Sequence, residues 1–293
     1  MNPGMEKMMK IRDVAKIIKT TEVTEGAGVT VHRSIGTPAL RNFDPFVMLD
    51  HFGSNDPDQY IAGFPDHPHR GFNTFTYMLE GNMLHRDSMG NEGNLISGAA
   101  QWMKAASGVI HSEMPQQKEG MMSGFQLWIN LPASEKMSEP AYQEYPPASF
   151  PVVQQADKKV KVLLGQYDDV SGPITDPHTK VSYFDVTLEP LVRFEHELKK
   201  EFTAFVYIFE GTIRIGDKLI DTHSFVALGP GEQVVIEADD NGARFILVAG
   251  QPIGEPIIQY GPFVMNTREE VMQAMAEYND GTLVQHKAEM IDG

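Results

Sequence analysis

An internal repeat limits the choice of folds for this chain more than any other feature. Residues 75–81 (FTYMLEG) reappear 130 residues later as residues 205–211 (FVYIFEG), with four of the seven positions identical. Each copy has the pattern of a β-strand that ends in Glu-Gly and enters a hairpin. One copy in each half of the chain favours duplication of a single β-barrel module. A chance match between two edge strands is the alternative explanation.

Short apolar or alternating runs recur along the chain, separated by Gly, Asn, Asp and Pro. Long segments with a helical period are nearly absent before the C-terminus, so the pattern predicts a mostly β protein. Gly216-Asp217 and Asn241-Gly242 are expected to form tight hairpin turns, where a positive φ is needed. The predicted strands are residues 29–35, 72–79, 125–131, 160–164, 182–188, 204–209, 233–238 and 244–249.

A proline-rich stretch separates the two halves. Five prolines lie between residues 132 and 151, and they prevent a regular helix or a central strand. Since the length also favours two domains, we predict an N-terminal barrel over 1–135, a linker over 136–155 and a C-terminal barrel over 156–293. The last part includes one short structural helix, which begins at a capping box formed by residues 267–270 and buries Val271, Met275 and Tyr278.

The composition excludes several functions. The net charge is -16, with 24 Lys and Arg against 40 Asp and Glu, which argues against direct binding of nucleic acid because that affinity comes mostly from neutralising phosphates. The absence of cysteine excludes disulfides, iron–sulfur clusters and thiolate nucleophiles. Residues 1–5 lack the features of a secretory signal, and no run reaches the length of a membrane span. By default we expect a soluble, cytoplasmic protein with no membrane partner.

Two short motifs, His67-Pro68-His69 and His111-Ser112-Glu113, place ligand-capable side chains at positions i and i+2. On a β-strand such positions share a face. If the two strands are neighbours, three imidazoles and one carboxylate meet at one point, which suits a first-row divalent metal such as iron better than calcium or magnesium. An isolated histidine is more often an ordinary core or surface residue; this interpretation is given to His32, His51, His85, His178 and His286.

The spacing of the two motifs resembles the cupin pattern, in which a His-x-His pair opens one strand and a later Gly-x-x-His supplies a third imidazole. In ordinary cupins a Glu follows the His pair, but Asn73 and Thr74 stand there, and Glu113 can replace it from the other strand. Longer motifs resemble the pirin family: DHFG at 50–53, DHPHRGF at 66–72, QWM at 101–103, GVIHSEMP at 108–115, LWINLP at 127–132 and GPFVMNT at 261–267.

The resemblance covers nearly the whole chain and implies an all-β bicupin, with two tandem antiparallel barrels and one Fe(2+) in the N-terminal barrel. In the family's manner, His67, His69, His111 and Glu113 would bind the ion, and other divalent transition metals would fit the same ligands. Pirins commonly carry Glu at the position of Asn73. This departure leaves the four ligands intact but puts the charge around the metal in question.

The second half is predicted to hold no metal, so that each chain binds one ion. Alignment of the repeat places Glu197 and Lys199 where the His-x-His pair stands in the first half, and a lysine would repel a cation. Val234 falls where the third histidine would be. His196 lies one residue out of register and is expected to face the opposite side.

The resemblance also implies quercetin 2,3-dioxygenase activity. A flavonol would lose the proton of its 3-hydroxyl to Glu113, bind the iron and react with O2, which opens the heterocycle and releases carbon monoxide. Four protein ligands around an octahedral ion leave two positions open for this chemistry. Phe52 and Phe64 are candidates to stack on the flavonol, although core packing explains them equally well.

Two other functions are consistent with the same residues. Pirins are also similar to regulatory proteins that engage transcription factors or metabolic enzymes, so the partner would then be a protein and the iron a redox or structural element. An ion that only closes the barrel would have no open coordination position and would not exchange small molecules.

Overall fold

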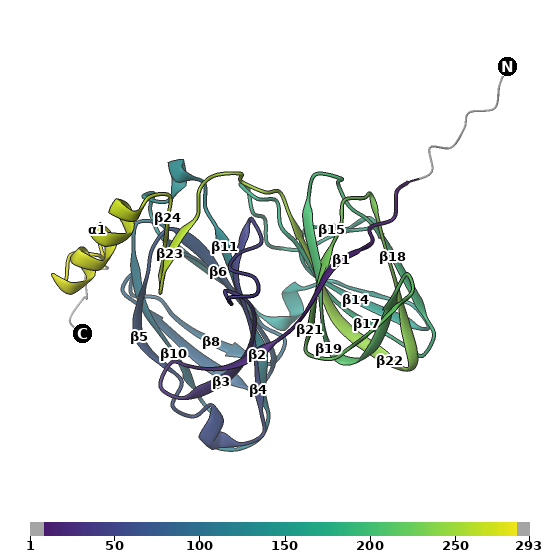
Figure 1. The fold of residues 1–293 in the computed structure, drawn as a ribbon. Helices are drawn as coiled ribbons and strands as arrows, with labels where there is room; N and C mark the ends of the chain where they lie inside the picture. The colour runs from purple at the N-terminus through teal and green to yellow at the C-terminus, as the bar shows by residue number, and fades with distance from the viewer. Residues whose placement is uncertain (1–8, 286–293) are drawn as a thin grey trace. The chain divides into compact units, whose positions relative to one another are not determined.

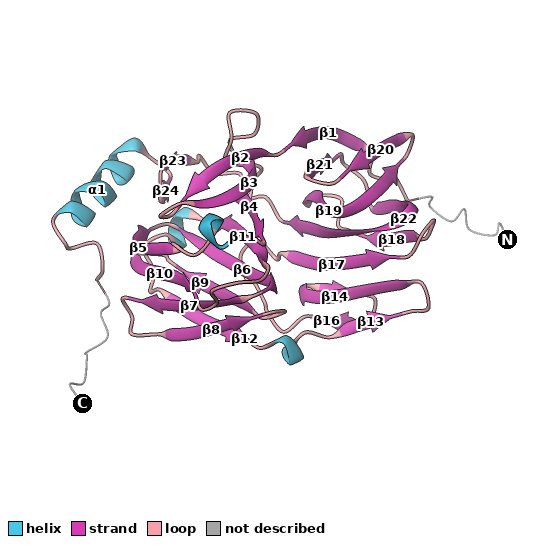
Figure 2. Cartoon of the chain, turned by 90° about the horizontal axis from the view of Figure 1, so that it is seen from below, coloured by secondary structure: helices cyan, strands magenta, loops and turns pink. Residues whose placement is uncertain are grey.

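The computed structural model describes residues 9–285 of the chain. These residues are mostly in β-strands, with one α-helix near the C-terminus (Figures 1 and 2). They form two compact units. We call residues 21–149 and 253–285 the first barrel, and residues 9–20 and 150–252 the second barrel. The predicted all-β fold class is confirmed; residues 1–5 and His286, which carried sequence predictions, lie outside the described residues.

Two antiparallel sheets build the first barrel. Their strands combine continuous buried runs such as residues 72–78 with alternating ones such as Glu92–Ile96, where every second side chain is buried. The larger sheet has the order β12 (Ala141–Tyr145), β9 (Ala100–Lys104), β6 (Phe72–Glu80), β11 (Met122–Asn130), β4 (Phe46–Ser54), β3 (Val29–Ile35) and β2 (Thr21–Glu25). The smaller sheet has the order β5 (Phe64–His69), β10 (Val109–Pro115), β7 (Asn82–Asp87) and β8 (Glu92–Ile96).

The C-terminal segment completes the first barrel with a short hairpin, β23 (Ile258–Tyr260) and β24 (Phe263–Met265), and the helix α1 (Arg268–Asn279). The predicted capping box at the start of α1 is present, with reciprocal bonds between Thr267 and Glu270. The helix buries Val271 and Ala274, and Met275 is partly buried, whereas Tyr278 is 39% exposed, so only part of the predicted apolar face packs. Three short 3-10 turns complete the unit: η1 (Pro57–Gln59), η2 (Ala133–Glu135) and η3 (Pro147–Ser149).

The second barrel is formed by one nine-stranded sheet around an apolar core. Its main path is β1 (Val14–Lys19), β21 (Ser224–Leu228), β19 (Thr203–Ile215), β22 (Gln233–Gly250), β17 (Ser182–Leu188), β14 (Lys158–Leu164) and β13 (Val152–Gln154). Off this path, β18 (Arg193–Glu197) pairs with β22, and β20 (Lys218–Asp221) pairs with β19. A separate small hairpin joins β15 (Gln166–Tyr167) and β16 (Val170–Ser171).

The units differ from the predicted division of the sequence at both ends of the chain. Strand β1 lies in the second barrel because it pairs with β21. The segment after residue 252 lies in the first barrel, where Phe263, Ala274 and Leu283 form an apolar cluster with Ile110. The change between units at residues 149 and 150 falls inside the predicted linker, which also carries β12 and β13, each at the edge of its sheet. Edge positions tolerate the surrounding prolines.

The eight predicted strands all overlap strands of the structure, but one predicted turn is wrong. Gly216-Asp217 forms the expected tight turn between β19 and β20. Asn241-Gly242 forms no hairpin, because β22 continues through it as a single strand. Opposite this point the pairing with β19 jumps from Ala238 to Ala243, so the extra residues form a bulge and the positive φ of Gly242 serves that bulge.

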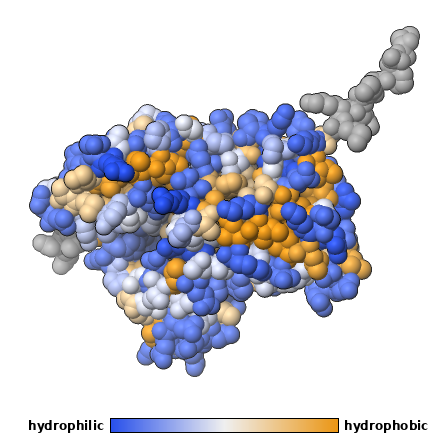
Figure 3. All heavy atoms as spheres, viewed as in Figure 1, coloured by the Kyte–Doolittle hydropathy of each residue, from blue (hydrophilic) through white to orange (hydrophobic). Residues whose placement is uncertain are grey.

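Part of the surface of the first barrel is strongly hydrophilic. In Figure 3, hydrophilic side chains cover the loop that contains η1, where Asp56 and Asp58 are exposed.

Between residues 9 and 285, no helix combines the length and the apolar character that crossing a membrane requires.

Candidate metal centre

Strands β5 and β10 lie side by side and bring the two sequence motifs together. His111 pairs directly with His67, and Val109 pairs with His69 in the antiparallel ladder. The three imidazole rings therefore point to one place, with centroids 4.3 Å apart for His67 and His111, 4.7 Å for His67 and His69, and 4.8 Å for His69 and His111. One nitrogen from each ring lies within 4.8 Å of the others.

The free nitrogens of this cluster fit a cation. His69 Nδ1 and His111 Nε2 have no hydrogen-bond partner, and they are also shielded from water, because both residues are at most 2% exposed. The other nitrogen of His69 donates to the carbonyl of Pro262, and His67 Nδ1 lies 2.8 Å from the carbonyl of Pro65. Buried lone pairs without a donor are unfavourable unless something positive meets them. A metal ion is the partner that the donor set favours.

Burial keeps the inner imidazoles neutral. Desolvation lowers the pKa of His69 well below its ordinary value, and the charge of His67 lowers it further. Desolvation likewise lowers the pKa of His111, together with the three neighbouring histidines. Neutral imidazole is the form that binds metals, so the two buried rings are in the protonation state that a metal site requires.

Glu113 lies on the same face of β10 as His111 and is 5% exposed. Its Oε1 accepts hydrogen bonds from Gln101 Nε2 at 2.5 Å and from Thr76 Oγ1 at 3.2 Å. One carboxylate oxygen of Glu113 lies within 4.8 Å of ring nitrogens of His111 and His85. Glu113 does not form such a group with His67, His69 and His111 together. The structure therefore contains two overlapping groups of ligand side chains that share His111.

His85 and Asp87 are parts of this centre that the sequence analysis missed. His85 Nδ1 lies 3.3 Å from His111 Nδ1, and His85 Nε2 lies 3.2 Å from Asp87 Oδ2. The network assigns a tautomer in which His111 donates to His85 and His85 donates to Asp87, which leaves His111 Nε2 as a lone pair. The signal was present, because His85 and Asp87 also stand at i and i+2 on a strand.

Asn73 lies on the side of β6 opposite to Thr76, because residues three apart on a strand face opposite ways and the pairing of β6 with both neighbours is regular there. The carboxylate that pirins commonly carry at this position would therefore not join the polar side chains around Glu113. The departure at Asn73 leaves that hydrogen-bonded network unchanged.

A cavity of about 1220 Å³ opens beside the histidines, and His67, His69, Glu113, Thr76 and Gln126 all line it. This exceeds the usual volume of a site for a small ligand. Phe52 and Phe64, the predicted aromatic contacts, also line the cavity. Both also pack in an apolar cluster of the barrel, so the core packing named as the alternative is present, and stacking on a flavonol stays a prediction.

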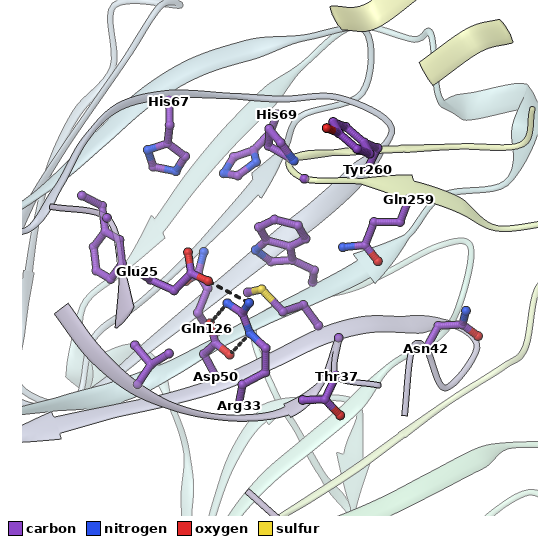
Figure 4. A pocket seen from close by; sticks show the side chains of 18 of the residues that line it. Glu25, Arg33, Thr37, Asn42, Asp50, His67, His69, Gln126, Gln259 and Tyr260 are labelled. Carbon is purple, nitrogen blue, oxygen red and sulfur yellow. Dashed lines mark hydrogen bonds and ion pairs between the residues drawn. The ribbon is translucent and has the colours of Figure 1, made fainter. Parts of the chain in front are cut away.

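The wall opposite the histidines carries an ion-paired group (Figure 4). Arg33 Nε and Nη2 bind both oxygens of Asp50 at 2.7 and 2.6 Å, and Arg33 Nη1 lies 2.7 Å from Glu25 Oε1. Although burial opposes the charge, the hydrogen bonds and charges of the two carboxylates raise the pKa of Arg33. The hairpin β23–β24 provides another part of the wall, including the exposed side chain of Tyr260.

The corresponding place in the second barrel has a different register from the predicted one. His196 pairs with Val234, just as His67 pairs with His111. His196 is therefore the counterpart of His67, and Leu198 follows it inward, while Glu197 is exposed. The expectation that His196 faces away from the core is wrong: its ring packs on Tyr167 and Phe184.

The reason is one extra residue. Nine positions separate His196 from Phe205, whereas eight separate His67 from Phe75, so the repeat cannot be counted back without a gap. Among the described residues, both groups of three or more potential metal ligands lie in the first barrel. Of the other histidines given an ordinary role, His51 stacks on Phe125 with centroids 4.7 Å apart, outside those groups.

The sequence matches known protein families along both barrels. Residues 28–129 match the family model described as Pirin, and residues 183–284 match the Pirin C-terminal cupin domain. A pirin-like protein of Caulobacter vibrioides is 46% identical over 275 residues, which cover 93% of this chain and 99% of the relative.

Solved structures give the same assignment of fold. The crystal structure of a quercetin 2,3-dioxygenase from Acinetobacter baumannii matches with a TM-score of 0.87 and 28% identity, covering 94% of this chain and 99% of that one. The Escherichia coli pirin YhhW in complex with nickel(II) matches with a TM-score of 0.64 and 20% identity, over 81% of this chain and 98% of that one, which is a likeness of fold.

Two cupin-type barrels, of which the first contains a buried histidine cluster beside a cavity, define the protein as a bicupin. The two family matches and the 46% identity over almost the full length identify the family within that class. The chain belongs to the pirin family.

Proposed function

We propose that this protein is an iron-dependent quercetin 2,3-dioxygenase, with the site in the first barrel. The observation that carries the proposal is the cluster of three imidazoles, two of them buried and neutral, next to Glu113 on the wall of a cavity large enough for a flavonol. The likeness to the Acinetobacter quercetin 2,3-dioxygenase supports the choice of reaction.

We assign the metal to His67, His69, His111 and Glu113, with one Fe(2+) per chain. When bound, ferrous iron supplies the Lewis acidity and the redox chemistry with O2 that ring cleavage and release of carbon monoxide require. The histidines contribute neutral nitrogen donors whose orientations are fixed by Pro65, Pro262 and His85 through their second ring nitrogens.

Glu113 serves as the base for the 3-hydroxyl of the flavonol. Its Oε1 is held by Gln101 and Thr76, and the side chain lines the cavity, so a substrate hydroxyl can approach the carboxylate. A general base must lie within hydrogen-bonding reach of the proton that it removes. Trp128 and Phe64 form apolar parts of the cavity wall around this carboxylate.

The test is anaerobic loading with ferrous iron, elemental analysis, and addition of quercetin and O2 while carbon monoxide and flavonol absorbance are followed. We expect about one iron per chain and stoichiometric carbon monoxide. Glu113→Gln should lower the rate at least about 100-fold, in the range of a lost general base, whereas Glu119→Gln, an exposed control, should not change it. Full iron occupancy without carbon monoxide from any flavonol would rule the proposal out.

A further inference from the structure

The cavity has chemically different sides. His67 and His69 lie along one side, and Glu25, Arg33 and Asp50 lie along the other (Figure 4). The histidine side holds imidazole nitrogen donors, and a bound metal would make this side positive. The other side contains one guanidinium and two carboxylates, which gives it a formal charge of minus one.

The arrangement of that second side fixes its chemistry. Asp50 takes two of the N–H groups of Arg33 in a bidentate pair, and its side chain is 6% exposed. Glu25 takes a third N–H group through Oε1, while its side chain is 39% exposed and its Oε2 accepts no hydrogen bond from the described residues. Glu25 Oε2 is therefore a carboxylate oxygen on a side chain that Arg33 holds in place, and no donor from residues 9–285 occupies it.

An acceptor of this kind discriminates between ligands. A neutral hydroxyl group donates to a carboxylate in a charge-assisted hydrogen bond, which is stronger than a neutral one. A carboxylate, sulfate or phosphate on the ligand has no proton to donate and is repelled by the net negative charge. Arg33 cannot attract such an anion freely, because its charge is already neutralised by Asp50 and Glu25.

We propose that Glu25, positioned by Arg33 and Asp50, accepts a hydrogen bond from a hydroxyl group on the outer phenyl ring of the substrate. The cavity then selects flat aromatic ligands that chelate a metal at one end and carry an uncharged hydroxyl donor at the other. This selectivity rests on the proposed function, which supplies the chelating end. It concerns a different side of the cavity from the metal ligands and can fail separately.

The experiment measures binding without turnover. The full-length protein is loaded with zinc, which has no redox chemistry, and titrated with two flavonols by absorbance. Galangin has an unsubstituted phenyl ring, and kaempferol adds one 4′-hydroxyl, which cannot chelate the metal in a reversed orientation. We expect kaempferol to bind about 10-fold more tightly, the effect of one hydrogen bond to a charged group. A flavonol with a 4′-carboxylate should bind more weakly than galangin.

The decisive variant is Glu25→Gln, which keeps the size of a partly exposed side chain and removes its charge. The preference for kaempferol should fall to about 2-fold, and the penalty for the 4′-carboxylate should shrink. Glu22→Gln on the same strand, outside the cavity lining, should leave both ratios as in the unchanged protein.

The outcomes separate the two proposals. If zinc-loaded protein binds neither galangin nor kaempferol, the chelating end is wrong, and the proposed function fails together with this inference. If both flavonols bind equally, or if the preference for kaempferol survives in Glu25→Gln, the role of Glu25 is overturned while the proposed function stands.

Discussion

The Nδ1 atoms of His111 and His85 lie 3.3 Å apart, and both side chains are buried. Because two nitrogens at this distance share one proton, the position of that proton decides which nitrogen of His111 keeps a lone pair. Asp87, bound to the far side of the His85 ring, directs the proton toward the shared contact. The proposed ligand His111 is thus oriented by His85, which is not among the predicted ligands.

We predict that His85→Phe lowers the affinity for the divalent metal about 10- to 100-fold, the range of a lost partner of a metal-binding histidine. Phenylalanine preserves the ring that stacks on Tyr142, with centroids 4.5 Å apart, but removes both nitrogens. Competition with a chelator of known affinity measures the change. His51→Phe, at a buried and stacked histidine outside the ligand groups, is the control; an equal loss in both variants would contradict the prediction.

A second prediction concerns the side chain that holds Glu113. Gln101→Met keeps the volume of a fully buried residue but removes the N–H that donates to Glu113 Oε1. We expect the rate of flavonol cleavage to fall about 10-fold, because the carboxylate loses its fixed orientation. The rate is expressed per bound iron, so that a change in the iron content of the variant does not affect the comparison. Gln143→Met, an exposed glutamine on β12, should have no effect; unchanged turnover in Gln101→Met would refute this role.

Local sequence patterns were sufficient for most of the fold and for the first part of the site. The period of a strand placed His67 with His69, and His111 with Glu113, on shared faces. The pairing of β5 with β10, which brings the two pairs together, was consistent with those patterns but follows from long-range contacts.

What could not be predicted depends on contacts that no short window contains. The local pair of His85 and Asp87 does not by itself point to His111, because only the pairing of β7 with β10 places His85 beside that residue. The extra residue before Phe205 shifted the predicted register of the second barrel by one position. As a result, the inward orientation of His196 was not predicted. The pairing of β1 with β21 joins segments about 200 residues apart, and loop closure over such a length has no local signal.

A buried lysine gives a third prediction. The Lys136 side chain is 1% exposed, and its Nζ donates to the Gly71 carbonyl at 2.7 Å, Asn130 Oδ1 at 2.5 Å and the Val264 carbonyl at 2.8 Å. All three acceptors are uncharged, so burial is compensated only in part. Desolvation lowers the pKa of Lys136 to about 7, although more distant carboxylates oppose the shift.

The sign of the pH effect follows from proton binding. Between about pH 7 and 10, the unfolded chain keeps the lysine protonated while the folded chain releases the proton, so the stability of the folded state rises with pH. Relative to Lys136→Met, which does not titrate, the free energy of unfolding should rise by up to about 1.4 kcal/mol per pH unit in this window. Urea unfolding at pH 7, 8 and 9 measures the difference, and parallel pH profiles for the two proteins would contradict a lowered pKa.

The last prediction concerns Arg70, which follows the proposed ligand His69 and connects β5 to the C-terminal segment. Its Nε donates to the Ser107 carbonyl at 2.6 Å, and its Nη2 contacts Glu277 Oε2 at 2.6 Å and the Leu283 carbonyl at 3.2 Å. Its side chain is 2% exposed. Replacement by methionine leaves buried acceptors without a donor, so we expect Arg70→Met to cost about 3 kcal/mol of stability.

The loss should be concentrated in the segment that Arg70 anchors. Hydrogen exchange of the amides of α1 should accelerate more than that of β6 or β11, because helix and barrel lose the bond at Glu277. Arg86→Met is the matched control: Arg86 and Glu92 form an ion pair whose side chains are 64% and 61% exposed, and such surface pairs contribute little. Uniform acceleration across the first barrel, or an equal effect of Arg86→Met, would show that Arg70 does not specifically hold the C-terminal segment against the sheet that contains β5 and β10.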